Sequence, residues 1–179
     1  MPSPVEDFAK WFASLDPKAQ AAASEKFKRA TGGTLSAWAN PKPVAVALIP
    51  VNTTGGLRLL GLRRAIAPHK GKIALPGGFL EEGEDSLHAC AREVLEETGL
   101  ASSPGNYVRI GADHAGSNAT LLMFCRSICP LTFEQFTHLR QVHPATSDGE
   151  ASELVLIDPD TPLCFPLHQQ AAQGFFRTS

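Results

Sequence analysis

The spacing of apolar residues changes near Pro41, where a helical pattern gives way to a mixed one. Before this point apolar side chains recur at helical intervals, and the run 18–29 is rich in alanine and charged residues. The helical apolar positions are Phe8, Trp11, Phe12 and Leu15. A glycine pair at 32–33 ends this pattern. We therefore expect residues 1–40 to form a helical extension, which could cover the core, mediate a homodimer or shape specificity.

Short apolar runs after Pro41 predict β-strands. Val44 to Ile49 is an unbroken apolar run, as in a strand that is buried on both faces. A polar turn over 52–56 separates it from the run Leu57 to Leu62, so we expect a hairpin. Further strand patterns fall at 107–110, 120–125 and 153–157, and helical patterns fall at 132–142 and 167–176. Interleaved strands and helices favour the α/β class, while the early hairpin argues against a purely parallel sheet.

A third pattern, between Asp85 and Gly99, predicts a single amphipathic helix. Asp85 or Ser86 can cap its start, and Gly99 supplies the left-handed residue that ends many helices. The residues expected on its buried face are Leu87, Ala91, Val94, Leu95 and Thr98. Glutamates occupy positions between them, so the rest of the helix surface should be acidic.

Acidic side chains gather on this helix and at its start. Glu93, Glu96 and Glu97 are spaced so that their side chains should leave the helix on neighbouring rows, away from the apolar face. Glu84 precedes the helix and can reach back along the same side. Such like charges repel unless cations such as Mg²⁺ or Mn²⁺ neutralise them. A solvated acidic face is the alternative, but it would favour interspersed lysines, and the basic partner in this helix is Arg92.

Residues 78–100 have the sequence GFLEEGEDSLHACAREVLEETGL. They contain a glycine, then five residues, a glutamate, seven residues and the run Arg-Glu-aliphatic-any-Glu-Glu-any-Gly-aliphatic. Every specified position of this pattern is filled, and the pattern resembles the Nudix box. The resemblance implies the Nudix fold, a mixed β-sheet sandwiched between α-helices (α/β/α), over residues 41–179. It also implies that Glu93, Glu96 and Glu97 bind metal ions, that Glu84 supports or joins the site, and that Arg92 orients the carboxylates.

Basic side chains and glycines before the box are candidates for substrate binding. Arg64 and Lys70 are the favoured pair, because cationic donors beside a metal cluster complement a diphosphate. Gly77 and Gly78 allow the backbone to come close to a ligand. The carbonyl oxygen of Gly78 can add a further metal ligand.

Glu150 is a candidate from the later part of the chain. It precedes the strand pattern at 153–157, in a position that resembles the acidic residues which many Nudix enzymes bring to the site. It could bind a further metal ion or act as general base on water. The sequence does not choose between Glu150 and the glutamates of the box as the base.

Composition narrows the classes of partner. The chain has 179 residues, a formal net charge of −2 and a pI near 6.3, which gives no bulk attraction to nucleic acid or to anionic membranes. It contains no apolar run of about twenty residues, so we expect a cytoplasmic protein without a membrane partner. The cysteines form no Cys-x-x-Cys pair, which favours buried reduced thiols over a zinc site.

These features together predict metal-dependent hydrolysis of a nucleoside diphosphate linked to another group X, by attack of activated water. The resemblance to Nudix enzymes implies ADP-ribose and NADH- or FAD-like dinucleotides as the candidate substrates. A catalytically inactive Nudix-fold module that senses a ligand is the alternative. Such modules usually lose one or more glutamates of the box, and none is lost in this chain.

Overall fold

The computed structural model describes residues 10–31, 41–115, 120–142 and 151–178. The chain divides into two compact units, Met1–Asn40 and Pro41–Ser179. The second unit contains all the β-strands of the described residues and the predicted acidic helix. None of the helices in the described ranges combines the length and the apolar character that crossing a membrane requires.

The described part of the first unit is helical, as its sequence pattern predicts. Residues 10–14 form one helical segment and α2 (Pro17–Thr31) follows. Asp16 caps α2, because its Oδ1 accepts hydrogen bonds from the backbone N–H groups of Lys18 and Ala19, both at 2.9 Å. Of the predicted apolar stripe, Phe12 is buried and Trp11 is half exposed, while Phe8 lies outside the described residues.

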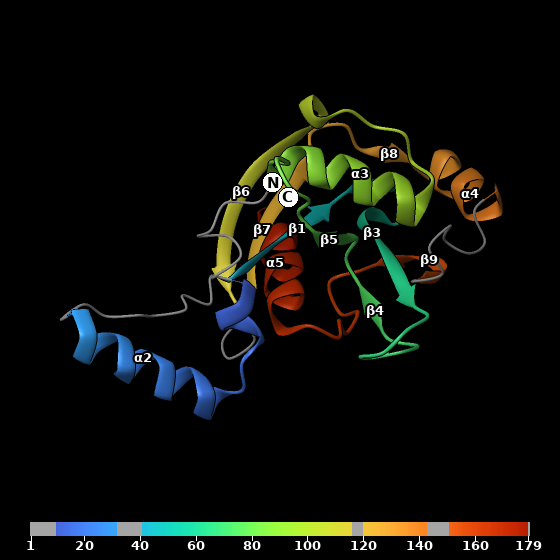
Figure 1. Cartoon of the computed structure of the whole chain (residues 1–179). Coiled ribbons are helices and arrows are strands. Elements are labelled where there is room, and N and C mark those ends of the chain that lie inside the picture. Colours follow the sequence, from blue (N-terminus) through green and yellow to red (C-terminus); the bar gives the residue numbers. More distant parts are fainter. Residues whose placement is uncertain (1–9, 32–40, 116–119, 143–150, 179) are drawn as a thin grey trace. The chain divides into compact units, whose positions relative to one another are not determined.

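Two mixed β-sheets run through the second unit (Figure 1). The strands of the first are β1 (Lys42–Leu48), β5 (Gly77–Phe79), β6 (Tyr107–His114) and β7 (Thr120–Ser127). Those of the second are β2 (Pro50–Thr53), β3 (Gly56–Arg64), β4 (Ile73–Ala74), β8 (Leu131–Thr132) and β9 (Ala151–Ile157). The strand orders are β5-β1-β7-β6 and β4-β3-β2-β8, with β9 paired to β3. The pairs β1–β7 and β2–β8 are parallel, and the other pairs are antiparallel.

The predicted hairpin is present, but its first strand is not the one expected. β2 pairs with β3, whereas the apolar run 44–49 mainly forms β1 in the other sheet. The chain passes between the sheets at Ile49, whose carbonyl accepts a hydrogen bond from the N–H of Leu60 at 2.9 Å. Because Leu48, Ile49 and Val51 are all buried, the apolar pattern does not show where one sheet ends and the other begins.

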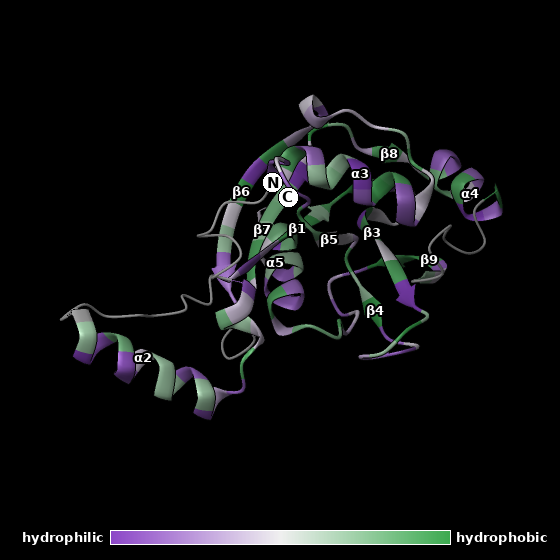
Figure 2. Ribbon diagram, viewed as in Figure 1, coloured by the Kyte–Doolittle hydropathy of each residue, from purple (hydrophilic) through white to green (hydrophobic). Residues whose placement is uncertain are grey.

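Helices cover both faces of β1, which confirms the expected α/β/α layering. The helices are α3 (Ser86–Thr98), α4 (Phe133–Val142) and α5 (Pro166–Arg177). Ala45 and Ala47 belong to a core cluster with residues of α3 and α4, whereas Val46 and Leu48 belong to a second cluster with residues of α5. This alternation follows from the two-residue period of a strand. Figure 1 shows β1 between α3 and α5, and Figure 2 shows hydrophobic and hydrophilic residues alternating along α3.

The later predicted elements are confirmed, with longer strands than their apolar runs suggest. β6, β7 and β9 cover the three strand patterns, and α4 and α5 cover the two helical patterns. Thr132 and Gln135 have capping-box spacing and form both of its hydrogen bonds, at 2.8 and 3.1 Å. The pattern missed β4, β5 and β8, because strands of two or three residues are too short to show alternation. Cys90 and Cys125 are buried and unbridged, as predicted.

Candidate active site

Local interactions fix both ends of α3, the helix that carries the glutamates. The carboxylate of Asp85 accepts hydrogen bonds from the backbone N–H groups of Leu87 and His88 at 2.8 and 3.0 Å. Hydrogen bonding from His88 is the main cause that lowers the pKa of Asp85 to about 2. At the other end, Gly99 has a φ of 72°, and its N–H donates to the carbonyl of Leu95 at 2.9 Å. Both predicted caps are confirmed, with Asp85 as the N-cap.

The buried face of α3 differs from the predicted face at two positions. Periodicity places Leu95 on the buried face, but this residue is 49% exposed. Periodicity places Glu97 on the polar face, but this residue is only 6% exposed. The reason is β5, because the N–H of Gly77 donates to Oε2 of Glu97 at 2.8 Å and brings that carboxylate under cover. The expectation that all three glutamates project away from the buried face is therefore wrong for Glu97.

Gly77 and Gly78 allow β5 to run close to both β1 and α3. A Cβ atom on Gly77 would lie 2.1 Å from the carbonyl oxygen of Ala45, and one on Gly78 would lie 2.3 Å from Oε1 of Glu93. Gly77 also has a φ of 150°, at the edge of the range that favours glycine. The structure thus requires these glycines for packing against protein groups. Their approach to a ligand stays a prediction.

Arg92 connects three of the glutamates. Its Nε and Nη2 donate to the two carboxylate oxygens of Glu84 at 3.1 and 2.9 Å, and its Nη1 donates to Glu93 at 2.8 Å and to Glu96 at 3.1 Å. Nη2 also donates to the carbonyl oxygen of Phe79 at 2.9 Å. The bidentate pair is formed with Glu84, eight residues before Arg92 in the chain. These hydrogen bonds lower the pKa of Glu84 and raise the pKa of Arg92.

A cavity of about 1010 Å³ opens beside this cluster. Residues of the predicted site that line it are Arg64, Gly77, Gly78, Arg92, Glu93, Glu96 and Glu97. A cavity of this size accommodates a ligand as large as a nucleotide. The acidic cluster and the cavity therefore form one candidate site.

The donor set of this cavity suits a hard divalent cation. The carboxylates of Glu84, Glu93 and Glu96 all contact the guanidinium of Arg92, so these four groups together carry a net negative charge. Within the described ranges, no three His, Cys, Asp or Glu side chains are grouped closely enough to hold a metal ion by themselves. Mg²⁺ commonly binds through one or two carboxylates and completes its shell with waters and substrate phosphates, so oxygen donors in this arrangement fit it.

Residues 41–175 match the family profile described as the NUDIX domain, which is most of the chain. The chain belongs to the Nudix family. Among solved structures, the Nudix domain of Shewanella oneidensis NrtR, crystallised with ADP ribose, has a TM-score of 0.59 and 18% identity. That match covers 96% of this chain and 98% of the other, and it confirms the Nudix fold.

Two curated relatives carry functional names. An ADP-ribose pyrophosphatase of Methanocaldococcus jannaschii is 51% identical over 43 residues, which are 24% of this chain and 25% of that protein. The ADPR responsive transcriptional repressor NtrR of Acinetobacter baylyi is 33% identical over 134 residues, which are 69% of this chain and 48% of the repressor. The Nudix chain thus spans about half or less of the length of these relatives.

Outside the Nudix box, the predicted substrate residues have different positions. Arg64 lines the cavity, and its guanidinium lies 5.3 Å from the ring centre of Phe165. Lys70 is exposed and is not among the lining residues. Lys70 lies in a loop whose two ends are joined by a hydrogen bond, from the N–H of Arg64 to the carbonyl of Lys72 at 2.9 Å. Glu150 lies outside the described residues.

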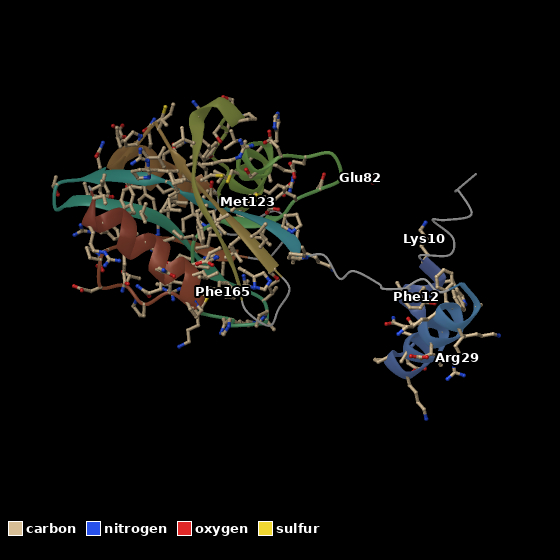
Figure 3. All side chains as sticks on the ribbon, turned by 90° about the vertical axis from the view of Figure 1, so that its left-hand side faces the viewer. Lys10, Phe12, Arg29, Glu82, Met123 and Phe165 are labelled. Carbon is tan, nitrogen blue, oxygen red and sulfur yellow. The ribbon has the colours of Figure 1, made fainter. Side chains whose placement is uncertain are left out.

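Two residues that the sequence pattern does not single out also line the Nudix cavity. Phe165 directly precedes α5 (Figure 3), and His168 lies in the first turn of this helix. His168 is 7% exposed, and burial lowers its pKa to about 4. Its Nδ1 accepts a hydrogen bond from the N–H of Leu75 at 3.2 Å. The local sequence gives no sign that His168 accepts this hydrogen bond in the cavity wall, because Leu75 and His168 are 93 residues apart.

Proposed function

We propose that this Nudix chain hydrolyses the diphosphate bond of a nucleoside diphosphate linked to another group X, with Mg²⁺ or Mn²⁺ as cofactor. The observation that carries the proposal is one cavity lined by Glu93, Glu96 and Glu97 and by Arg64. The carboxylates of these glutamates suit a metal ion, and the guanidinium of Arg64 suits a phosphate. The names of the pyrophosphatase relative and of the ADP-ribose complex support ADP-ribose as the first substrate to test.

Each residue then has a distinct task. Glu93, Glu96 and Glu97 would supply carboxylate ligands to the metal, and waters and substrate phosphates would complete its shell. The metal would lower the pKa of a bound water and neutralise charge on the phosphates. Arg92 keeps Glu93 and Glu96 in place through Nη1. The N–H of Gly77 orients Glu97 in the same way. We leave the general base open between a glutamate of the box and Glu150.

Arg64 would bind a phosphate of the substrate within the cavity. Its Nε donates to the carbonyl of Pro68 at 2.9 Å, which holds the guanidinium at the cavity wall. A planar guanidinium forms strong, charge-assisted hydrogen bonds with phosphate oxygens. The exposed position of Lys70 gives it less support as the second phosphate ligand.

A ligand-responsive regulatory module is the second candidate. The 33% identity with the repressor NtrR over 134 residues favours it. The complete set of box glutamates favours catalysis instead, because binding alone does not need a full metal site. Measured turnover separates the two functions.

The first prediction concerns the glutamates of α3. With Mg²⁺ or Mn²⁺, the wild-type protein should release phosphorylated products from ADP-ribose, NADH or FAD, identified by mass spectrometry. Glu96→Gln and Glu97→Gln should each reduce turnover by orders of magnitude, because a neutral amide binds a hard cation poorly. Thermal unfolding curves check that both variants fold.

Glu82→Gln is the matched control for these substitutions. Glu82 is exposed in the loop between β5 and α3 (Figure 3) and is not among the cavity-lining residues, so turnover should stay unchanged. Wild-type turnover in both Glu96→Gln and Glu97→Gln would refute the metal assignment. A wild-type protein that binds ADP-ribose without cleaving any of the three substrates would support the regulatory module.

A further inference from the structure

His168 presents one hydrogen-bond donor that the proposed chemistry does not use. Its Nδ1 accepts a hydrogen bond from the N–H of Leu75. A ring nitrogen that accepts a hydrogen bond carries no proton, so neutral His168 has its proton on Nε2. The bond to Leu75 thus sets both the tautomer and the orientation of the ring.

The Nε2–H group of His168 lies at the wall of the cavity. Nε2 makes no hydrogen bond to any group in the described part of the chain. Within the same part, every fully buried side-chain nitrogen or oxygen atom has a hydrogen-bond partner. An unpaired Nε2 must therefore reach an open surface, and the open surface that His168 lines is the cavity.

Flat side chains lie close to the imidazole of His168. The ring centres of Phe165 and His168 are 5.0 Å apart, and the guanidinium of Arg64 lies 5.3 Å from the ring centre of Phe165. Apolar residues that line the same cavity include Ile66, Pro68 and Leu167. A ligand group that enters such a place should be flat and should need few hydrogen bonds. A sugar with several hydroxyls would leave polar groups without partners.

This part of the cavity is next to the acidic cluster. The N–H of Leu75 holds His168, and the N–H of Gly77 holds Glu97. The two donors are only two residues apart in the chain, so the two parts of the cavity are neighbours. One nucleotide can therefore reach both, with its phosphate near the glutamates and its base near His168.

We infer that His168 and Phe165, beside the phosphate-binding Arg64, form the pocket that recognises the nucleobase of the substrate, with Nε2 of His168 donating to an acceptor on the ring. The inference rests on the proposed function, because it assigns one part of the diphosphate substrate to this pocket. It makes His168 a substrate-binding residue, distinct from the metal-binding glutamates. It also gives the cavity a preference for nucleotides over sugar phosphates.

Binding of AMP and of ribose 5-phosphate, which lacks the base, tests this assignment. Calorimetric titration with Mg²⁺ present should show AMP bound at least about tenfold more tightly by the wild type. His168→Asn keeps an acceptor for the N–H of Leu75 but loses the donor at the Nε2 position. It should weaken AMP binding roughly five- to tenfold and leave ribose 5-phosphate binding unchanged. His168→Gln places an amide near the Nε2 position and should keep most of the affinity for AMP.

These two variants separate recognition from a structural role. If His168 acted only through Leu75, His168→Gln would lose more affinity than His168→Asn, or both ligands would weaken equally, and either result overturns the inference. Equal wild-type affinity for AMP and ribose 5-phosphate overturns it as well, as does a lack of AMP binding. His138→Asn is the control, because His138 is exposed on α4 and is not among the cavity-lining residues.

The outcome is independent of whether the protein is an enzyme. A wild type that binds AMP through His168 but cleaves no diphosphate would retain the pocket and refute the catalytic proposal. A wild type that cleaves diphosphates while His168→Asn binds AMP with unchanged affinity would retain catalysis and refute the pocket. Thermal unfolding curves of each variant check that a loss of affinity does not reflect loss of the fold.

Discussion

Single residues decide the geometry of the acidic cluster. Glu93 occupies the space that a side chain on Gly78 would need. Glu97 is buried, and a buried carboxylate needs a hydrogen-bond donor, which the N–H of Gly77 supplies. The two glycines therefore position the two glutamates in different ways. Gly78 leaves space for Glu93, and Gly77 donates a hydrogen bond to Glu97.

Gly78→Ala tests this arrangement at the residue scale. The new Cβ should displace the Glu93 carboxylate, reduce turnover at least about tenfold and lower the free energy of unfolding by about 1–3 kcal/mol. Turnover of the substrate found in the screen and unfolding in urea measure these effects. Unchanged turnover in a folded variant would contradict the assigned position of Glu93.

Gly174→Ala is a matched glycine control. An added Cβ at Gly174, inside α5, would meet no atom within 4 Å. Alanine is a better helix former than glycine, so this variant should gain about 0.5–1 kcal/mol in the free energy of unfolding. Its turnover should equal that of the wild type.

At the scale of elements, Arg92 ties α3 to the loop before it and to β5. The guanidinium contacts Glu84 in the loop, Glu93 and Glu96 in α3, and the carbonyl of Phe79 in β5. A planar group with several donors can serve all four at once, whereas an ammonium group cannot keep this geometry. This explains why an arginine suits this place better than another cation.

Arg92→Lys should weaken this connection while it keeps the charge. We expect the free energy of unfolding to fall by about 1–2 kcal/mol and turnover to fall at least about tenfold, because Glu93 and Glu96 lose a shared donor. Urea unfolding and steady-state kinetics measure the two effects. Arg126→Lys, at an exposed position of β7, should change neither. Equal behaviour of the two variants would refute the bracing role of Arg92.

At the scale of the whole second unit, His168 connects α5 to the segment that leads into β5. Its hydrogen bond to Leu75 joins parts of the chain that are 93 residues apart. The ring also packs against Phe124 of β7, with ring centres 6.5 Å apart. The neutral form of His168 is therefore part of the packing between the first sheet and α5.

This contact predicts a stability that depends on pH. Burial lowers the pKa of His168 from 6.5 to about 4, so between these values the unfolded chain binds more protons than the folded protein. The stabilisation is complete above about pH 6.5 and is lost as the pH falls toward about 4. From this group alone, the free energy of unfolding should be about 2 kcal/mol lower at pH 5 than at pH 7.5.

Urea unfolding at pH 5 and pH 7.5 measures the difference. His168→Asn removes the titrating group and should remove most of the difference, whereas His138→Asn should retain it. An equal pH dependence in the wild type and in His168→Asn would show that other groups cause it.

Sequence alone was enough to identify α3, its caps and the family pattern, because hydrogen bonds at helix ends and spacing along a helix involve neighbouring residues. It also located most strands and helices. It could not assign the bidentate partner of Arg92, the burial of Glu97 or the point at Ile49 where the chain changes sheets.

Three-dimensional packing settled those features for a physical reason. Each depends on groups that meet only after the sheets and helices have packed together. The N–H of Gly77 meets a carboxylate 20 residues away, and the N–H of Leu75 meets an imidazole 93 residues away. The chemistry carried by one helix was therefore readable in the chain, while the shape of the cavity around it, with Phe165 and His168 in its wall, depended on the fold.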